Sequence, residues 1–162
     1  MTSFYLVRHG EPDWELNEKH KLKGHGRDLP HLTQNGIAQA KEIAKDDRIR
    51  GSEIIIASPY TRTMHTAAII SKETGIELAV EFDLREWQPD LTYQFDSLEQ
   101  LKQLTDDYYH HKGIHPEGQE KQWESKQAMK NRIEAVLEKY KTYSHVTVVT
   151  HRMLMSTLID TE

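Results

Sequence analysis

The sequence predicts an α/β fold, a three-layer α/β/α sandwich with a mostly parallel central sheet. Short apolar runs alternate along the chain with segments of helical periodicity, which is typical of parallel sheets covered by helices on both faces, with right-handed crossovers. Two of the runs, 4–7 and 145–150, end in the same way, at Arg8-His9 and at His151-Arg152. Since 162 residues suffice for one core, we expect a single domain over 1–162.

Four segments have the composition of strands. Residues 53–57 form a continuous apolar run, as expected of a strand buried on both faces, and 145–150 are rich in β-branched residues. The first strand begins at Phe4, and 78–84 alternate imperfectly between apolar and polar residues. Residues 12–32 carry glycines, prolines and charges without a period, so they are predicted to form a long loop, of the kind that is usually functional or mobile.

Four helices are predicted between and after these strands. Thr33 is placed to cap the first, which ends before 46–47, and Pro59 suits the first turn of the second, which should stop at Gly75. Strong helix formers and amphipathic spacing predict the last over 122–143. The signal is weakest in a variable segment at about 87–118, where a helix over 97–111 is expected.

Composition restricts the class of partner. The net charge is −5 with scattered basic residues, which argues against nucleic acid, and no window approaches a membrane span. The absence of cysteine excludes disulfides, thiolate metal sites and a cysteine nucleophile, and we expect a cytoplasmic protein. Several histidines could suggest a metal site, but they lie in polar segments without rigid spacing, so surface histidines are expected and no cofactor or metal is predicted. These are His110, His111, His115 and His145. Oligomeric state is not indicated.

The ends of the predicted strands carry the chemistry. If the strands that end at His9, Ser58 and His151 are parallel and adjacent, their carboxyl ends open on one edge of the sheet, and Arg8, His9, Arg62 and His151 can converge there. Arginine offers a planar fork of donors that fits phosphate, and a neutral histidine nitrogen can attack phosphorus. Neighbouring arginines should keep His9 neutral. The alternative is that these side chains lie apart on the surface.

Five motifs resemble those of the histidine phosphatase superfamily, the phosphoglycerate-mutase-like proteins. Residues 6–11, Leu-Val-Arg-His-Gly-Glu, match the signature of that family, and 24–28 with the start of the next helix resemble its loop and first helix. Residues 58–63 match its second arginine motif, 84–86 match the segment that carries the acid, and 149–151 lie where its second histidine belongs. The resemblance covers nearly the whole chain and implies the sandwich fold described above.

The resemblance also implies roles for individual residues. His9 is expected to form a phosphohistidine that water then hydrolyses, while Arg8 and Arg62 hold the phosphoryl oxygens. His151 is expected to add a donor to these oxygens in the transition state. Glu86 is expected to protonate the leaving oxygen and then to help activate water, with a pKa raised by partial burial.

Other positions leave alternatives open. Glu11 is the competing acid, although an ion pair or structural hydrogen bond is the more expected role, and Asn17 is a loosely aligned candidate for a phosphate contact. Arg152 follows the second histidine, where the family has glycine or aspartate. It could be a third phosphate ligand or a surface charge, and the surface position is favoured. Eleven residues, 152–162, follow His151, where the family usually has room for a helix and a further strand. The chain is expected to be either a natural minimal form or one that has been cut short, and in both cases the sheet edge beyond that helix is expected to be unprotected.

The function expected from this resemblance is a phosphatase acting on a phosphomonoester or a phosphoprotein. The alternatives are mutase-type phosphoryl transfer and a non-catalytic protein that binds phosphorylated partners through the same pocket. Residues 87–118 contain no arginine, which favours hydrolysis over a mutase with extra arginines in that segment. Aromatic residues of this region could line the cleft or form a small local core, and the core is favoured. These aromatic residues are Trp87, Tyr93, Phe95, Tyr108 and Tyr109.

Overall fold

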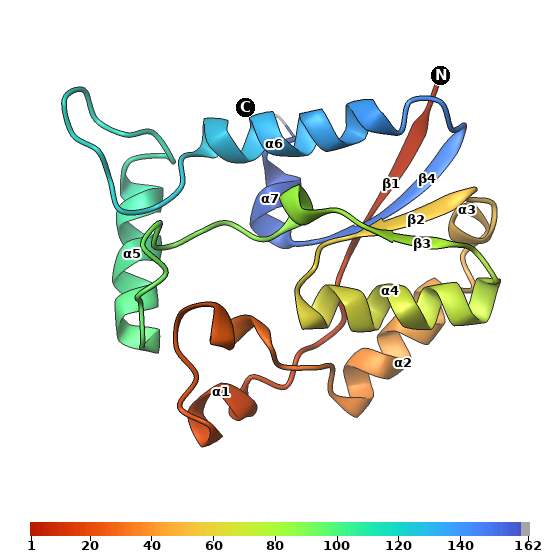
Figure 1. Ribbon diagram of the computed structural model, residues 1–162, viewed down its shortest axis with the longest axis horizontal. Helices are drawn as coiled ribbons and strands as arrows, with labels where there is room; N and C mark the ends of the chain where they lie inside the picture. The colour runs from red at the N-terminus through yellow and green to blue at the C-terminus, as the bar shows by residue number, and fades with distance from the viewer. Residues whose placement is uncertain (160–162) are drawn as a thin grey trace.

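The computed structural model describes residues 1–159 and contains one parallel sheet (Figure 1). Its strands are β1 (Ser3–Arg8), β2 (Ile54–Ala57), β3 (Leu78–Val80) and β4 (His145–Thr150), in the order β1-β4-β2-β3. Every pair is parallel. The strands β1, β4 and β2, which carry the expected site residues at their ends, are therefore neighbours, as the sequence predicted.

Helices cover both faces of this sheet. The helices of residues 1–159 are α1 (Glu15–Lys19), α2 (Gln34–Ile43), α3 (Asp47–Arg50), α4 (Thr61–Thr74), α5 (Leu98–His110), α6 (Lys126–Lys139) and α7 (Arg152–Ser156), with 3-10 turns η1 (Gly24–Asp28) and η2 (Phe82–Leu84). Of these, α1 and α5 lie beside the sheet (Figure 1). Side chains along β2 point alternately to the two faces of the sheet, and each face has its own hydrophobic core. Ile54 and Ile56 belong to the core that contains Ile133 of α6, and Ile55 belongs to the core that contains Ile70 of α4. Figure 1 shows α2 and α4 below the strands, and α6 and α7 above them. The α/β/α sandwich is confirmed.

Local signals correctly predict several helix ends. The Thr33 hydroxyl accepts a hydrogen bond from the Gly36 N–H and so caps α2, as expected. Helix α4 stops at Gly75, whose φ of +75° suits a residue without a side chain. Ser97 caps α5, which covers the predicted helix to within one residue at each end. Capping chemistry acts locally, so it can be read from sequence.

Other predicted bounds were wrong. The expected loop 12–32 contains α1 and η1, and a short α3 follows α2 where only an interruption was foreseen. Helix α4 begins after Tyr60, so Pro59 lies before the helix instead of in its first turn. The elements α1, η1 and α3, which were not predicted, have only four or five residues and are too short to show a hydrophobic period.

The strand β3 and the helix α6 are both shorter than predicted. The expected strand over 78–84 is paired only at Leu78–Val80, after which the chain leaves the sheet through η2. The helix expected over 122–143 begins at Lys126, where the Ser125 hydroxyl caps the Ala128 N–H. Trp123 lies just before this helix and is completely buried, with its indole N–H donating to Asp107. A tertiary contact thus overrides its helical spacing.

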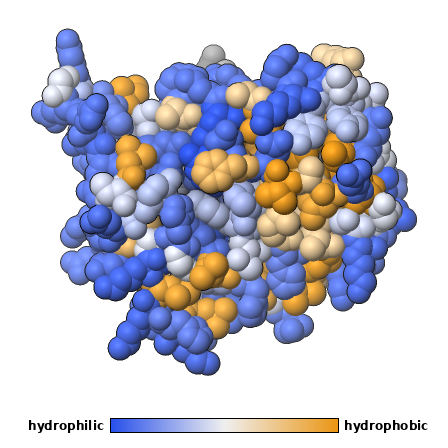
Figure 2. Space-filling view, in the orientation of Figure 1, coloured by the Kyte–Doolittle hydropathy of each residue, from blue (hydrophilic) through white to orange (hydrophobic). Residues whose placement is uncertain are grey.

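Some apolar side chains remain exposed on the surface, near one edge of the sheet. Figure 2 shows apolar side chains gathered over the strands, and the edge region after β3 exposes Val80 and Phe82. In the sheet of residues 1–159, β1 and β3 are the edge strands. No helix in that range has the length and apolarity needed to cross a membrane.

Candidate active site at the carboxyl ends of the strands

A cavity of about 540 Å³ contains most of the residues predicted from the strand ends. Arg8, His9, Arg62 and Glu86 all line it. They come from the end of β1, the first turn of α4 and the segment after η2, and thus from regions that are distant in sequence. The sequence-based expectation that these side chains meet is correct, and the alternative that they lie scattered on the surface is wrong.

His9 is presented as a neutral imidazole with one free nitrogen. Its Nδ1 lies 2.7 Å from the Gly10 carbonyl oxygen, and because a carbonyl only accepts, Nδ1 must carry the proton. The lone pair is therefore on Nε2. Burial is the main cause that lowers the pKa of His9 to about 4, with smaller contributions from Arg62 and Arg8. At neutral pH, His9 is an uncharged potential nucleophile.

His151 is completely buried behind this nucleophile and does not line the cavity itself. Its ring centroid lies 5.3 Å from that of His9 and 5.3 Å from that of Tyr60. Its Nε2 lies 2.8 Å from the Ser58 hydroxyl, which already accepts from the Tyr60 N–H. A hydroxyl oxygen has two lone pairs, so Ser58 can either donate to Nε2 or accept from it, and donation by Ser58 would leave the imidazole proton on Nδ1.

The remaining nitrogen of His151 is thus a candidate donor. Among the described residues, neither His151 Nδ1 nor Arg62 Nε has a hydrogen-bond partner, although both atoms are buried. Burial, followed by the charge of Arg62, holds the pKa of His151 well below its usual range, so the ring is neutral. Buried donors without partners are uncommon, and they fit a site that binds an anion.

Arg62 is held in place from three sides. Its guanidinium donates to the Asp28 carboxylate at 2.9 Å and lies 5.1 Å from the ring centroids of both Trp14 and Tyr60. Burial is the larger effect on Asp28 and raises its pKa, even though the neighbouring Arg62 opposes this. Sequence reasoning missed Asp28 as the partner of Arg62, and its only signal was its place in the 24–28 motif.

Glu86 points its carboxylate at the start of α7. It accepts hydrogen bonds from the N–H groups of Trp87 at 2.8 Å, Leu154 at 3.1 Å and Met153 at 3.3 Å. Burial is the dominant effect and raises the pKa of Glu86, against the three N–H groups that favour the carboxylate. This is the direction that the sequence-based reasoning expected for an acid that keeps its proton near neutral pH.

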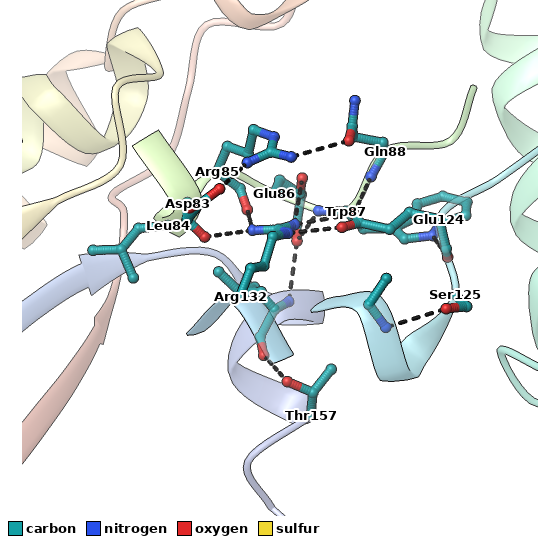
Figure 3. A network of polar contacts seen from close by, with 12 residues as sticks. Asp83, Leu84, Arg85, Glu86, Trp87, Gln88, Glu124, Ser125, Arg132 and Thr157 are labelled. Atoms are coloured by element: carbon teal, nitrogen blue, oxygen red, sulfur yellow. Dashed lines mark hydrogen bonds and ion pairs between the residues drawn. The ribbon is translucent and has the colours of Figure 1, made fainter. Parts of the chain in front are cut away.

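A buried ion pair holds the segment that carries Glu86 (Figure 3). The Arg132 guanidinium of α6 donates to the backbone carbonyls of Asp83, Arg85 and Glu86, at 2.6, 2.7 and 3.2 Å. It also binds both carboxylate oxygens of Glu124, at 2.7 and 3.0 Å. We call Arg132 and Glu124 the clamp. Sequence reasoning missed both residues, because a charged residue on an amphipathic helix has the same pattern as ordinary solvated surface.

Glu124 extends the clamp to the next part of the segment. Its carboxylate accepts from the Gln88 N–H at 3.1 Å, and its backbone carbonyl accepts from the Trp87 indole at 2.9 Å. Glu124 N–H donates in turn to the Gln88 carbonyl. Both partners of the clamp are largely buried, with 9% and 6% of their side chains exposed. The position of Glu86 in the cavity therefore depends on side chains from outside the sheet.

The three less certain candidates occupy different places. Glu11 is exposed, accepts from the side chains of Thr33 and Asn35, and lies outside the cavity of His9 and Glu86. These hydrogen bonds lower its pKa, with that from Thr33 first, so Glu11 has the structural role that was expected of it. Asn17 lines the cavity while its amide donates to the Arg27 carbonyl. Arg152 is exposed and lies outside the cavity lining.

The aromatic residues of 87–118 divide between the two predicted positions. Trp87, Tyr93 and Phe95 line the cavity, so the expectation of a purely local core was wrong for these three. Tyr108 is buried against Trp87, with ring centroids 5.0 Å apart, and belongs to the main core. Tyr109 is exposed.

Comparison with known proteins agrees with this geometry. A family model described as histidine phosphatase superfamily (branch 1) matches residues 4–161. The chain is 32% identical to the probable phosphoglycerate mutase GpmB of Escherichia coli O1:K1 over 171 aligned positions, which cover 99% of this chain and 74% of that protein. A match to the same-named protein of Enterobacter sp. (strain 638) is 41% identical but covers only 53% of this chain and 38% of the relative.

Solved structures share the fold. Bacillus stearothermophilus YhfR has a TM-score of 0.71 at 25% identity, covering 98% of this chain and 78% of that one. The phosphoserine phosphatase of Entamoeba histolytica, solved with 3-phosphoglyceric acid, has a TM-score of 0.65 at 26% identity, with the same two coverages. A mycobacterial glucosyl-3-phosphoglycerate phosphatase has a TM-score of 0.69 at 20% identity over 94% of this chain and 74% of its own length, a likeness of fold alone.

Proposed function

Because the chain belongs to the histidine phosphatase superfamily (branch 1), we propose that it hydrolyses phosphomonoesters through a phosphohistidine on His9. The observation that carries the proposal is the hydrogen bond from His9 Nδ1 to the Gly10 carbonyl, 2.7 Å long. It leaves Nε2 unprotonated beside Arg62, Arg8 and a neutral His151, where a phosphoryl group would be attacked.

The first step transfers the phosphoryl group to the protein. The lone pair of His9 Nε2 forms a bond to phosphorus while the ester P–O bond breaks, and protonated Glu86 gives its proton to the leaving oxygen. In the second step water attacks the phosphohistidine, the Glu86 carboxylate takes a proton from that water, and inorganic phosphate leaves. Both residues then return to their starting states.

The cations act on the charge that develops on the phosphoryl oxygens. Arg8 and Arg62 would bind these oxygens. The His151 Nδ1, which has no hydrogen-bond partner among the described residues, would add a neutral donor in the tautomer that protonates it, provided that the phosphoryl group reaches past the cavity lining to this buried ring. Arg62 is already oriented by Asp28 and two aromatic rings, so little reorganisation is needed when the phosphoryl group arrives. Preorganised donors of this kind contribute much of the rate acceleration in phosphoryl transfer.

Phosphoglycerate mutase activity is the second candidate, because the relatives that are 32% identical over nearly the whole chain bear that name. A mutase uses a second substrate hydroxyl as the acceptor, whereas a phosphatase uses water. Residues 87–118, which supply part of the cavity lining, contain no arginine to hold a second acidic group. This favours hydrolysis. Phosphoproteins remain within the proposed substrate class.

Phosphate release separates an enzyme from a non-catalytic phosphate-binding protein. The wild-type chain is expected to release phosphate from phosphomonoesters and to yield an acid-labile phosphoryl adduct after a rapid quench. The adduct and the release should both vanish in His9→Ala, with circular dichroism confirming that the variant is folded. If phosphomonoesters and phosphohistidine peptides all stay intact with the wild type, the enzymatic proposal fails.

A further inference from the structure

Apart from its catalytic groups, the cavity has an apolar wall. It is formed by Trp87 and Phe95, which are 5% and 8% exposed, by Leu98 and Leu101 of α5, and by Met153 of α7. Such side chains favour an apolar ligand, because contact with it removes apolar surface from water. A cavity of about 540 Å³ has the size that small organic ligands occupy.

Hydrogen bonds fix the backbone of the segment before Phe95, which forms part of this wall. The Asp90 carboxylate accepts from the backbone N–H groups of Thr92 and Gln94, and this fixes the turn before Phe95. Tyr93 within this turn has a φ of +58°, a strained value for a residue with a side chain. The Gly24 N–H donates to the Phe95 carbonyl at 2.9 Å, which ties this turn to η1. The wall is therefore part of the fold and needs no ligand to assemble.

Two of the three arginines that line the cavity are paired with carboxylates. Arg27 donates to the Glu18 carboxylate at 3.2 Å, and Arg62 donates to Asp28. The His25 ring packs against that of Tyr93 at a tilt of 32°, with centroids 3.8 Å apart, and its Nδ1 lies 3.8 Å from an Asp28 oxygen. Among the described residues that line the cavity, none is a lysine.

A second anionic group on a substrate would therefore meet unfavourable surroundings. Arg8 and Arg62 are needed by the phosphoryl group, and Arg27 is neutralised by Glu18. A carboxylate or a second phosphate placed against the wall would lose water without gaining a cation, which costs free energy. An apolar body in the same place would instead gain from burial.

From these contacts we infer that the esters this site takes carry an uncharged apolar body, aromatic or alkyl, and no second acidic group. This inference rests on the proposed function and deepens it. The relatives are named phosphoglycerate mutases, and phosphoglycerate bears a carboxylate as well as a phosphate. The inference therefore predicts that phosphoglycerate is a poor substrate for this chain. The body would lie against Phe95, Leu98 and Leu101.

Substrates with similar leaving groups test the inference. We compare 2-phenylethyl phosphate, glycerol 1-phosphate and 3-phosphoglycerate, all esters of alkyl alcohols, so the chemistry of the leaving oxygen is nearly constant. For the wild type, kcat/KM is expected to be at least tenfold higher for 2-phenylethyl phosphate than for either polar ester. Equal or higher values for 3-phosphoglycerate would overturn the inference.

Binding to His9→Ala separates this inference from the proposed function, because that variant binds substrate without turning it over. Calorimetry is expected to give a Kd at least tenfold lower for 2-phenylethyl phosphate than for 3-phosphoglycerate. If the wild type hydrolyses none of the esters, the proposed function fails, and this binding preference alone decides the inference. Tighter or equal binding of 3-phosphoglycerate rejects it even when hydrolysis is observed.

A charge placed on the wall gives a residue-level test. Leu98→Arg puts a cation on the cavity lining and is expected to lower the preference for 2-phenylethyl phosphate over 3-phosphoglycerate at least threefold. Ile114→Arg is the matched control, because Ile114 is 66% exposed and lies outside the cavity. The control should leave the preference unchanged. A preference unaffected by Leu98→Arg, or shifted equally by both, contradicts the assignment of this wall.

Discussion

The two halves of the candidate site are held by different forces. His9 and His151 follow β1 and β4, strands joined along their length by parallel pairing from Ser3 with His145 to Arg8 with Thr150. Glu86 instead lies on an irregular segment whose carbonyls are held by one guanidinium, that of Arg132. A strand position is maintained by many backbone hydrogen bonds, whereas the segment that carries Glu86 depends on the two side chains of the clamp.

This difference predicts different responses to substitution. We call Arg8, His9, Arg62 and His151 the strand-end half of the site. Removal of one of these side chains should lower activity and leave the sheet intact. In the clamp half, removal of one side chain should disturb the fold and the acid together. The predictions below test that contrast.

The largest effect is expected for Arg62→Gln. Loss of a guanidinium that stabilises transferring phosphoryl oxygens should lower kcat/KM by about 10³-fold. The sheet should stay intact because it does not depend on this side chain, and the loss of unfolding free energy should be limited to that of the Asp28 ion pair, which is more exposed than the clamp. Steady-state kinetics and thermal unfolding measure the two effects. Arg48→Gln is the control, since Arg48 pairs with Asp46 on the surface, and a similar loss of activity in that control would contradict the prediction.

A smaller but more diagnostic effect is expected for Arg132→Met. Displacement of Glu86 should lower kcat by about 10²-fold for alkyl phosphates, which need a proton on the leaving oxygen. It should have far less effect on p-nitrophenyl phosphate, whose leaving group is stable as an anion. The same variant should lose about 3 kcal/mol of unfolding free energy, because Glu124 is left buried and unpaired.

Two comparisons separate positioning from general destabilisation. Adding Glu124→Gln to Arg132→Met removes the buried carboxylate and should recover part of the unfolding free energy without restoring alkyl phosphate hydrolysis. Arg48→Met provides the surface control. Equal losses for alkyl and aryl substrates in Arg132→Met would mean that the clamp supports the fold but does not position the acid.

The pH dependence of kcat/KM offers a third test. Because burial raises the pKa of Glu86, the residue stays protonated to higher pH than an ordinary carboxyl group. Above that pKa, kcat/KM for 2-phenylethyl phosphate should fall by about tenfold for each pH unit. In Glu86→Gln the remaining activity should lack this alkaline limb. An identical limb in the variant would assign it to another group.

The contrast also explains how much could be predicted from the sequence. Strand ends are marked by an apolar run that stops at polar residues, and parallel topology then places Arg8, His9 and His151 together. The sandwich and the strand-end half of the site followed from this rule. Thr33 and Gly75 marked helix ends because capping acts over a few residues.

The rest depends on contacts that have no local pattern. Arg132 and Glu124 are eight positions apart, but the backbone carbonyls that Arg132 binds lie 46 to 49 positions away along the chain. Asp28 is likewise 34 positions from Arg62. The placement of Trp87 and Phe95 in the cavity was one of two alternatives and not the favoured one, because aromatic residues suit a core and a binding wall equally well. Side-chain partners of this kind are fixed only by the tertiary structure.

The smallest effect concerns stability and returns to the strand-end half. His9 has a pKa of about 4 in the folded chain against an ordinary 6.5, so at pH 5 the unfolded chain binds a proton that the folded chain does not. Its contribution to stability is therefore lost as the pH falls below 6.5, and linkage makes this loss about 2 kcal/mol between pH 7 and pH 5. His9→Ala should accordingly lose about 2 kcal/mol less than the wild type over that interval, measured by urea unfolding at both pH values. The exposed His110 provides the control substitution, His110→Ala. If His9→Ala and the wild type lose the same free energy, then His9 is not held neutral by its surroundings, and the strand-end half does not present the nucleophile in the form that the chemistry requires.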